Sequence, residues 1–175
     1  MSELGGSLQQ FRLLARYNQW MNQQLYAVCD TMADIDRKRD LGAFFKSIHG
    51  TLNHLLYGDK AWLGRFTGRP FDVTLLGHEL YADFAELRLA REHTDAEILA
   101  WCDTLTDAWL ASDFEFTSQA YGKTRVLPAW VLVTHLFNHQ THHRGQVTTL
   151  IKQLGYEPGI IDLPWMPEFD TPATG

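Results

Sequence analysis

The chain has 175 residues, which is enough for one domain with a sizeable core and too short to suggest two. Hydrophobic residues make up 45% of it and charged residues 21%, as in an ordinary globular protein. The net charge of -6 and the lack of a basic stripe argue against a nucleic-acid partner. We therefore predict a single domain over residues 1–175.

The cysteines and the N-terminal segment bear on the cellular location. Cys29 and Cys102 stand far apart and form no CxxC pair, so we expect two buried thiols rather than a disulfide or a cysteine zinc site. The opening MSELGGSLQQF lacks the positive and apolar regions of a secretory signal. No apolar run approaches the length of a membrane span. We expect a cytoplasmic protein with no membrane partner.

Two long helices are expected in the first part of the chain. From Ser7, a suitable cap, apolar residues recur with a helical period to about residue 30. The polar stretch ADIDRKRD ends in Asp40, which suits the cap of a second helix from about Leu41 to Phe66. The residues that would close this second helix are Thr67, Gly68, Arg69 and Pro70.

A third helix is predicted after a loop between Pro70 and Gly77. The helical period resumes in HELYADFAELRLAREH, which begins at His78. Thr94 and Glu97 have the spacing of a capping box, so a break near His93 is expected. The segment AEILAWCDTLTDAWLA then continues as helix.

The last third of the chain combines a hairpin, a helix and a tail. Between Asp113 and Leu127, the alternating runs FEFTS and KTRVL predict a small hairpin. Pro128 suits the first turn of a final helix that would end at Gly155. Four long amphipathic helices predict an all-α fold, a helix bundle. The proline-rich remainder is expected to be an irregular tail packed by Ile160, Leu163 and Trp165.

Two histidines of the predicted final helix lie in its apolar stripe. His139 and His143 are one turn apart, about 40° on a helical wheel. An imidazole that faces a core must have its ring nitrogens satisfied by a hydrogen bond, by water or by a metal. The pair therefore consists either of core histidines with hydrogen-bond partners or of two ligands of a metal site that needs a third.

His54, in the predicted second helix, is our candidate for the third ligand. The residues around it on the helical wheel are small, so they leave room for a pocket, although small residues also permit close contact between helices. Three imidazoles from two helices would leave one coordination position open, as in a catalytic rather than a structural site. The small neighbours are Ser47, Gly50, Gly58 and Ala61.

The other histidines rank lower. His135 and His142 could replace a ligand, but the apolar stripe is centred on the other side of His139. His49 falls outside the apolar arc of the second helix. The two that flank predicted helix ends, and that we expect in solvent, are His78 and His93.

A carboxylate is also predicted to lie on a buried face. Asp59 falls within the apolar arc of the second helix, where it would need a cation or hydrogen-bond donors. Arg144, directly after His143, is the candidate partner, and the alternative is that Asp59 reaches solvent.

Three motifs of this chain resemble those of the DinB/YfiT-like family of metal-dependent enzymes. They are YNQWMNQQL at Tyr17–Leu25, GTLNHLLYGDKAWLGRF at Gly50–Phe66 and HLFNHQTHHRGQV at His135–Val147. The resemblance implies a four-helix bundle with up-down-down-up topology, often dimeric, that binds a divalent ion, zinc or nickel. The ligand positions of the family match His54, His139 and His143.

Three functional interpretations follow. An open metal site suits a hydrolase or, as related families imply, a transferase that uses a low-molecular-weight thiol as its small-molecule substrate. The lack of an HExxH motif weakens a protease interpretation. The alternative is a non-catalytic metal-binding or stress-linked protein acting as a homodimer, and in a third interpretation all the histidines are structural. A second apolar side of the final helix, either a dimer seam or an internal contact, consists of Trp130, Val133 and Phe137.

Overall fold

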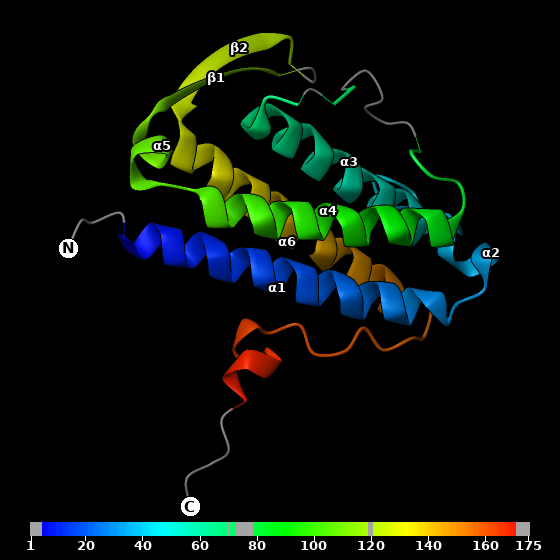
Figure 1. Cartoon of the computed structure of the whole chain (residues 1–175). Helices are drawn as coiled ribbons and strands as arrows, with labels where there is room; N and C mark the ends of the chain where they lie inside the picture. The colour runs from blue at the N-terminus through cyan, green and yellow to red at the C-terminus, as the bar shows by residue number, and fades with distance from the viewer. Residues whose placement is uncertain (1–4, 70, 73–78, 119–120, 171–175) are drawn as a thin grey trace, which may run out of the picture.

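The computed structural model describes residues 5–69, 71–72, 79–118 and 121–170 (Figure 1). Most of the chain lies in four long helices. The helix α1 packs against α4 and α6, and α3 packs against the same two helices. The protein is therefore mostly helical with one small hairpin, as the sequence predicts. The bounds of the long helices are α1 Gly5–Asp30, α3 Ile48–Thr67, α4 Phe84–Thr104 and α6 Ala129–Gln153.

The helix α3 begins at Ile48, so the predicted start near Leu41 is wrong. The side chain of Asp40 does accept a hydrogen bond locally, but from the backbone N–H of Gly42, at 2.9 Å from its Oδ1, within a turn and not at the start of a helix. The actual cap is Ser47, whose hydroxyl accepts from the N–H of Gly50 at 3.0 Å. The residues between the two positions turn back on themselves before the helix starts. A short helix, α2 (Asp34–Arg37), precedes this turn.

The helix α4 also departs from the predicted boundaries. It begins at Phe84, after the cap Asp83, rather than in the segment from His78, and His78 itself lies outside the described residues. No break occurs near His93, because the hydroxyl of Thr94 donates to the carbonyl of Ala90 at 2.8 Å instead of capping a new helix. The helix ends at Thr104. A separate short helix, α5 (Asp107–Ala111), follows and is capped by Thr106.

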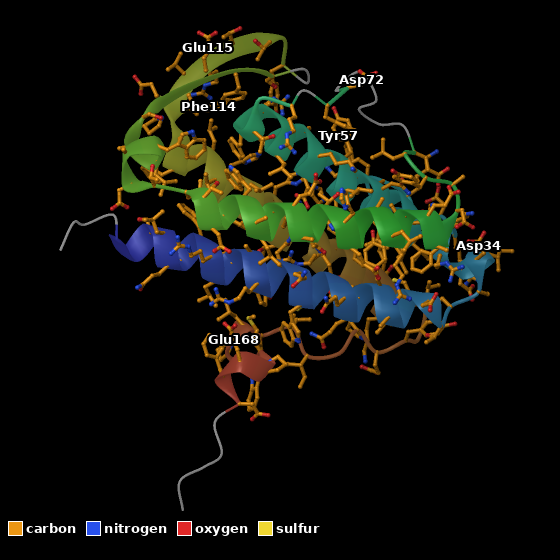
Figure 2. All side chains as sticks on the ribbon, in the orientation of Figure 1. Asp34, Tyr57, Asp72, Phe114, Glu115 and Glu168 are labelled. Atoms are coloured by element: carbon orange, nitrogen blue, oxygen red, sulfur yellow. The ribbon has the colours of Figure 1, made fainter. Side chains whose placement is uncertain are left out.

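The predicted hairpin is confirmed. The strands β1 (Asp113–Ser118) and β2 (Lys123–Pro128) are antiparallel, with Phe114 opposite Leu127. Phe114 points from β1 toward the helices, whereas Glu115 points away from them (Figure 2). The hairpin thereby places one side of β1 over the C-terminal part of α3 (Figure 1).

The C-terminal segment runs along α1 and is anchored mainly by polar contacts. The hydroxyl of Tyr17 donates to the carbonyl of Ile161 at 2.6 Å, and Arg16 pairs with Glu168 at 2.8 Å. The short 3-10 helices η2 (Leu163–Trp165) and η3 (Pro167–Phe169) interrupt it.

The side chains that hold this tail differ from those predicted. Ile160 and Trp165 are exposed, and Leu163 is only half-buried. Met166 is the buried apolar residue of the segment. An irregular tail has no fixed period, so the sequence pattern could not identify which apolar residue faces the helices.

A polar layer divides the hydrophobic core into two halves. One apolar cluster surrounds Leu25 and Leu52, the other surrounds Phe11 and Leu136. All four long helices contribute buried polar residues between these clusters. They are Asn18, Asn22, Asp59, Arg91, Asp95, Gln140 and Arg144.

The ion pairs in this layer correct the partner predicted for Asp59. Asp59 is buried, as its place on the wheel indicates, but it pairs with Arg91 of α4 at 2.5 Å. Arg91 also contacts Asp95, with 2.9 Å between Nη2 and Oδ1. Arg144 instead donates to the side-chain oxygen of Asn18. A helical wheel shows which face a residue lies on but not which neighbouring helix covers that face.

Two further predictions concern cysteines and membrane spans. Cys29 and Cys102 are both buried and free, as expected. None of the helices within the described ranges combines the length and the apolar character needed to cross a membrane.

Candidate metal centre

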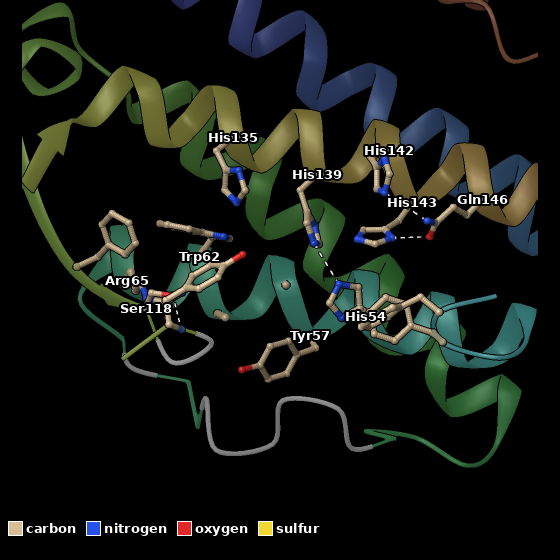
Figure 3. Close-up of a pocket in the computed structure, with 16 residues that line it drawn as sticks. His54, Tyr57, Trp62, Arg65, Ser118, His135, His139, His142, His143 and Gln146 are labelled. Atoms are coloured by element: carbon tan, nitrogen blue, oxygen red, sulfur yellow. Dashed lines mark hydrogen bonds between the residues drawn. The ribbon is translucent and has the colours of Figure 1, made fainter. Parts of the chain in front are cut away.

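The packing of α3 against α6 brings His54, His139 and His143 together (Figure 3). One ring nitrogen from each lies within 4.8 Å of the other two. The Nε2 atoms of His54 and His139 are 3.1 Å apart. Three imidazoles from two helices therefore converge on one point, as the sequence predicts. That they bind a metal remains a prediction.

Burial keeps these imidazoles neutral at neutral pH. Loss of solvation, with a smaller contribution from the neighbouring histidines, lowers the pKa of His54 to about 4 and that of His139 to about 3. Loss of solvation also lowers the pKa of His143, although a hydrogen bond to Gln146 opposes this shift. A neutral imidazole has a lone pair on one ring nitrogen, which a metal ion can accept.

A side-chain amide on α6 fixes the orientation of His143. Its Nδ1 lies 2.7 Å from Oε1 of Gln146. Because an amide oxygen only accepts, Nδ1 must carry the proton, and the lone pair is left on Nε2. Such a hydrogen bond to the far nitrogen is typical of histidines that ligate metals.

Gly58 provides the space that His139 occupies. A Cβ built on Gly58 would lie 2.8 Å from Cε1 and 3.2 Å from Nδ1 of His139, closer than carbon atoms normally approach. Within the described ranges, the Nδ1 atom of His139 is buried without a hydrogen-bond partner. The ring is therefore held against the backbone of α3, and its other nitrogen, Nε2, lies 3.1 Å from Nε2 of His54.

Phe45 lies beside His143, with ring centroids 5.5 Å apart, and covers one face of the His54 ring. Its ring stacks on the imidazole with centroids 3.8 Å apart. The turn that precedes α3 carries it there, and Gly50 permits the close approach, since a Cβ on Gly50 would lie 2.3 Å from the carbonyl oxygen of Phe45. Two of the small residues around His54 thus have separate uses, because Gly58 admits His139 and Gly50 admits this turn.

The three histidines form one wall of a cavity of about 540 Å³. His135 and His142 also line it, and the ring of His135 lies 5.9 Å from that of His139. Both histidines that ranked below the ligands in the sequence therefore face the same cavity. The hairpin supplies another part of the wall through Phe116 and Ser118.

Of the remaining histidines that the structure describes, neither His49 nor His93 lines the cavity. His49 is buried, and its Nε2 contacts the carbonyl of Tyr81 at 2.8 Å and a carboxylate oxygen of Glu79 at 3.0 Å. His49 is thus a core histidine, although the wheel places it outside the apolar arc, and among the described residues only its Nε2 has partners, since Nδ1 is buried without one. His93 is 71% exposed, as predicted.

Sequence reasoning missed several residues of this site. Gln146 has no apolar pattern or ligand spacing that distinguishes it, although its place one turn after His142 on the same helix puts it within reach. Phe45 was assigned to the second helix, so its position over His54 could not be foreseen. Trp62 and Arg65 follow Gly58 on the same face of α3, a periodicity that could have revealed the lining of the cavity.

The donor set fits a divalent transition metal. Imidazole nitrogen suits zinc, copper, iron and nickel, whereas magnesium and calcium prefer oxygen ligands. Three histidines would leave a fourth position for water or substrate, and that position would face the cavity. The neutral rings and the oriented lone pair of His143 agree with this assignment.

Comparison with known proteins agrees with the resemblance seen in the sequence. The chain is 25% identical over 155 residues to Protein DinB of Bacillus subtilis strain 168, covering 85% of this chain and 88% of that protein. The crystal structure of a DinB-like protein from Bacillus cereus ATCC 10987 matches with a TM-score of 0.63 and 22% identity, over 90% of this chain and 97% of that one, which supports the fold. The model of the DinB family matches residues 1–174, and the chain therefore belongs to the DinB family.

Proposed function

We propose that the protein binds a divalent transition metal, zinc or nickel, through His54, His139 and His143, and uses it in a reaction on a small molecule. The observation that carries this proposal is the convergence of three neutral imidazoles, within 4.8 Å, at the wall of a cavity. Membership of the DinB family is compatible with metal binding. The packing of α1 and α3, each against α4 and α6, supports the up-down-down-up four-helix bundle that the resemblance implies.

A divalent ion in this site would supply a Lewis acid that lowers the pKa of a bound water or thiol and stabilises developing negative charge. The protein supplies the surroundings. In the part of the chain that the structure describes, no carboxylate lines the cavity, and the side chains there that can take part in proton transfer are the imidazoles and the hydroxyls of Tyr57, Ser118 and Tyr121. His135 and His142 are the imidazoles outside the proposed ligand set.

Two reactions are compatible with such a site, hydrolysis and transfer of a low-molecular-weight thiol to an electrophile. Turnover of a panel of esters and electrophiles, with and without added thiol, would separate them. A rate that depends on thiol concentration would identify the transferase. A rate that is independent of thiol would exclude it and favour the hydrolase.

The metal proposal is tested by elemental analysis of protein purified without an affinity tag. We expect about one equivalent of a transition metal in the wild type, as a three-histidine site with an open position would hold, and a loss of this metal in His139→Ala. His93→Ala is the matched control, because it removes an exposed histidine. A wild type that neither carries nor takes up metal at neutral pH would overturn the proposal and favour structural histidines.

The non-catalytic alternative, a metal-binding homodimer, has less support in the structure. Val133 and Phe137 are buried within the chain itself, and of the three apolar residues on the second side of α6 only Trp130 remains substantially exposed, at 46%. The second apolar side of α6 is thus largely used for internal packing. The homodimer remains a prediction, which light scattering at working concentration would test.

A further inference from the structure

One face of α3 continues beyond the histidines as the floor of the cavity. His54, Gly58, Trp62 and Arg65 recur at helical spacing, and all of them line it. Arg65 comes eleven residues after His54, which is about 16 Å along the helix axis. Figure 3 shows Arg65 at the end of the cavity away from His54 and His143. The cavity therefore has two chemically different ends.

Arg65 is a half-buried arginine that has no acidic partner among the described residues. Its guanidinium lies over the ring of Trp62, with 4.9 Å between Cζ and the ring centroid. Among the described residues it makes no ion pair or hydrogen bond, whereas Arg91 pairs with two carboxylates. A half-buried guanidinium held on an aromatic ring keeps its donors available for an anion.

Among the described residues, the rest of the cavity lining carries no group that would repel an anion. The charge on its described lining comes from Arg65 alone while the histidines are neutral, although the whole chain has a net charge of -6. The walls are otherwise mostly aromatic. Two rim residues, Phe44 and Tyr121, are 86% and 82% exposed. Exposed aromatic rings at a cavity mouth would be covered by a flat apolar ligand. The aromatic lining consists of Phe44, Phe45, Tyr57, Trp62, Phe116 and Tyr121.

We propose that this cavity binds a small carboxylate with a flat apolar body, whose carboxylate group pairs with Arg65 while its opposite end faces His54, His139 and His143. A guanidinium can bind a planar carboxylate through two parallel hydrogen bonds. Side chains on a helix lean toward its N-terminus, so Arg65 leans back toward the histidines, and the two ends of the ligand would lie about 10 Å apart. This inference rests on the proposed function, since it names the class of substrate for that site.

The test compares 2-naphthoate with 2-naphthamide, which has the same shape and no charge. Binding to the full chain is measured by calorimetry, for the protein as purified and after chelation, so that a carboxylate bound to metal is distinguished from one bound to Arg65. In the chelated wild type we expect the carboxylate to bind at least about 10-fold more tightly than the amide, the size of one charge-assisted interaction.

The variants assign this preference to Arg65. Arg65→Gln should lose the preference while keeping its affinity for the amide, and Arg65→Lys should retain part of it. Arg88→Gln, which removes the same charge from the exposed surface of α4, should behave as the wild type. Because Arg65 makes no ion pair within the described chain, Arg65→Gln should fold with an unchanged melting temperature and metal content.

The outcomes separate this inference from the metal proposal. Equal binding of both probes to the wild type, binding of neither, or a preference that persists in Arg65→Gln would overturn the carboxylate site. A preference that depends on Arg65 in a protein that never takes up metal would support the carboxylate site and contradict the metal proposal instead. Normal metal content, with no preference for the carboxylate over the amide, would support the metal proposal and contradict the carboxylate site.

Discussion

Gly58 on α3 and His139 on α6 are in such close contact that a Cβ on the glycine would lie 2.8 Å from Cε1 of the imidazole. The ring is the far end of a side chain, so Gly58→Ala should displace the ring rather than unfold the protein. We expect the variant to fold and to lose metal affinity by about 10-fold or more, as when a ligand histidine is misoriented. Calorimetric titration with zinc, together with a thermal melt, measures both effects.

Gly145 offers a matched control for that substitution. It also lies inside a long helix, α6, but no atom comes within 4 Å of its virtual Cβ. Gly145→Ala should stabilise the protein by about 0.5–1 kcal/mol through the helix preference of alanine, with metal affinity unchanged. Equal metal affinities for the two alanine variants would show that the contact between Gly58 and His139 does not matter for the site.

Gln146 is expected to tune the site through His143. Its Oε1 accepts from Nδ1 of His143 at 2.7 Å, which fixes the ring and its tautomer. Gln146→Ala should lower metal affinity by about 10- to 100-fold, the usual effect of removing such a partner. Gln146→Glu keeps an acceptor in place and should restore most of the affinity. A glutamate variant as weak as the alanine variant would indicate that the hydrogen bond is not the cause.

The histidine cluster should make the metal-free protein less stable in mild acid. The pKa of His54 falls from 6.5 to about 4 and that of His139 from 6.5 to about 3, because burial disfavours the charged ring. Below pH 6.5 the unfolded chain therefore binds protons that the folded chain does not, so the free energy of unfolding decreases as the pH falls from about 6.5 toward 4.

Urea unfolding at pH 7 and pH 5, in the presence of a chelator, checks this pH dependence. His139→Gln removes one of the histidines whose pKa burial lowers, so it should lose less stability between these pH values than the wild type. His93→Gln, at an exposed position, should lose as much as the wild type. A loss that is the same in all three proteins would place the acid sensitivity elsewhere in the chain.

The parts of the fold that the sequence predicts are those with a strong period. Apolar spacing and alternation were sufficient for α1, α6 and the hairpin, and the wheel positions of His139 and His143 identified the helix face that meets His54. Side chains that can cap a helix were misleading, because the same side chains can also form other local hydrogen bonds. Asp40 has the chemistry of a helix cap but accepts within a turn, and Thr94 has the spacing of a capping box but bonds back to Ala90.

Contacts between helices were the other limit of sequence reasoning. The helical wheel places Asp59 on a buried face, and the structure confirms this. Its partner Arg91 lies on α4, however, and the position of Asp59 on its own helix could not indicate that partner. The same applies to Phe45, which reaches His54 only because the turn before α3 folds back over the helix. Such partners depend on which elements pack together, and the hydrophobic periodicity of a single sequence does not contain that information.

Arg91 should be the most sensitive charged residue for folding. It is buried between Asp59 and Asp95, so Arg91→Met would leave two buried carboxylates without their cation. We expect a loss of about 3–5 kcal/mol in the free energy of unfolding. Arg88→Met on the same helix removes an arginine whose pairs with Asp30 and Glu92 are exposed, and it should cost less than about 1 kcal/mol. Urea unfolding at pH 7 measures the loss of stability in each variant. Similar losses in the two variants would mean that the polar layer tolerates unpaired carboxylates. Protonation of Asp95 would allow this, because burial raises the pKa of that residue to about 6.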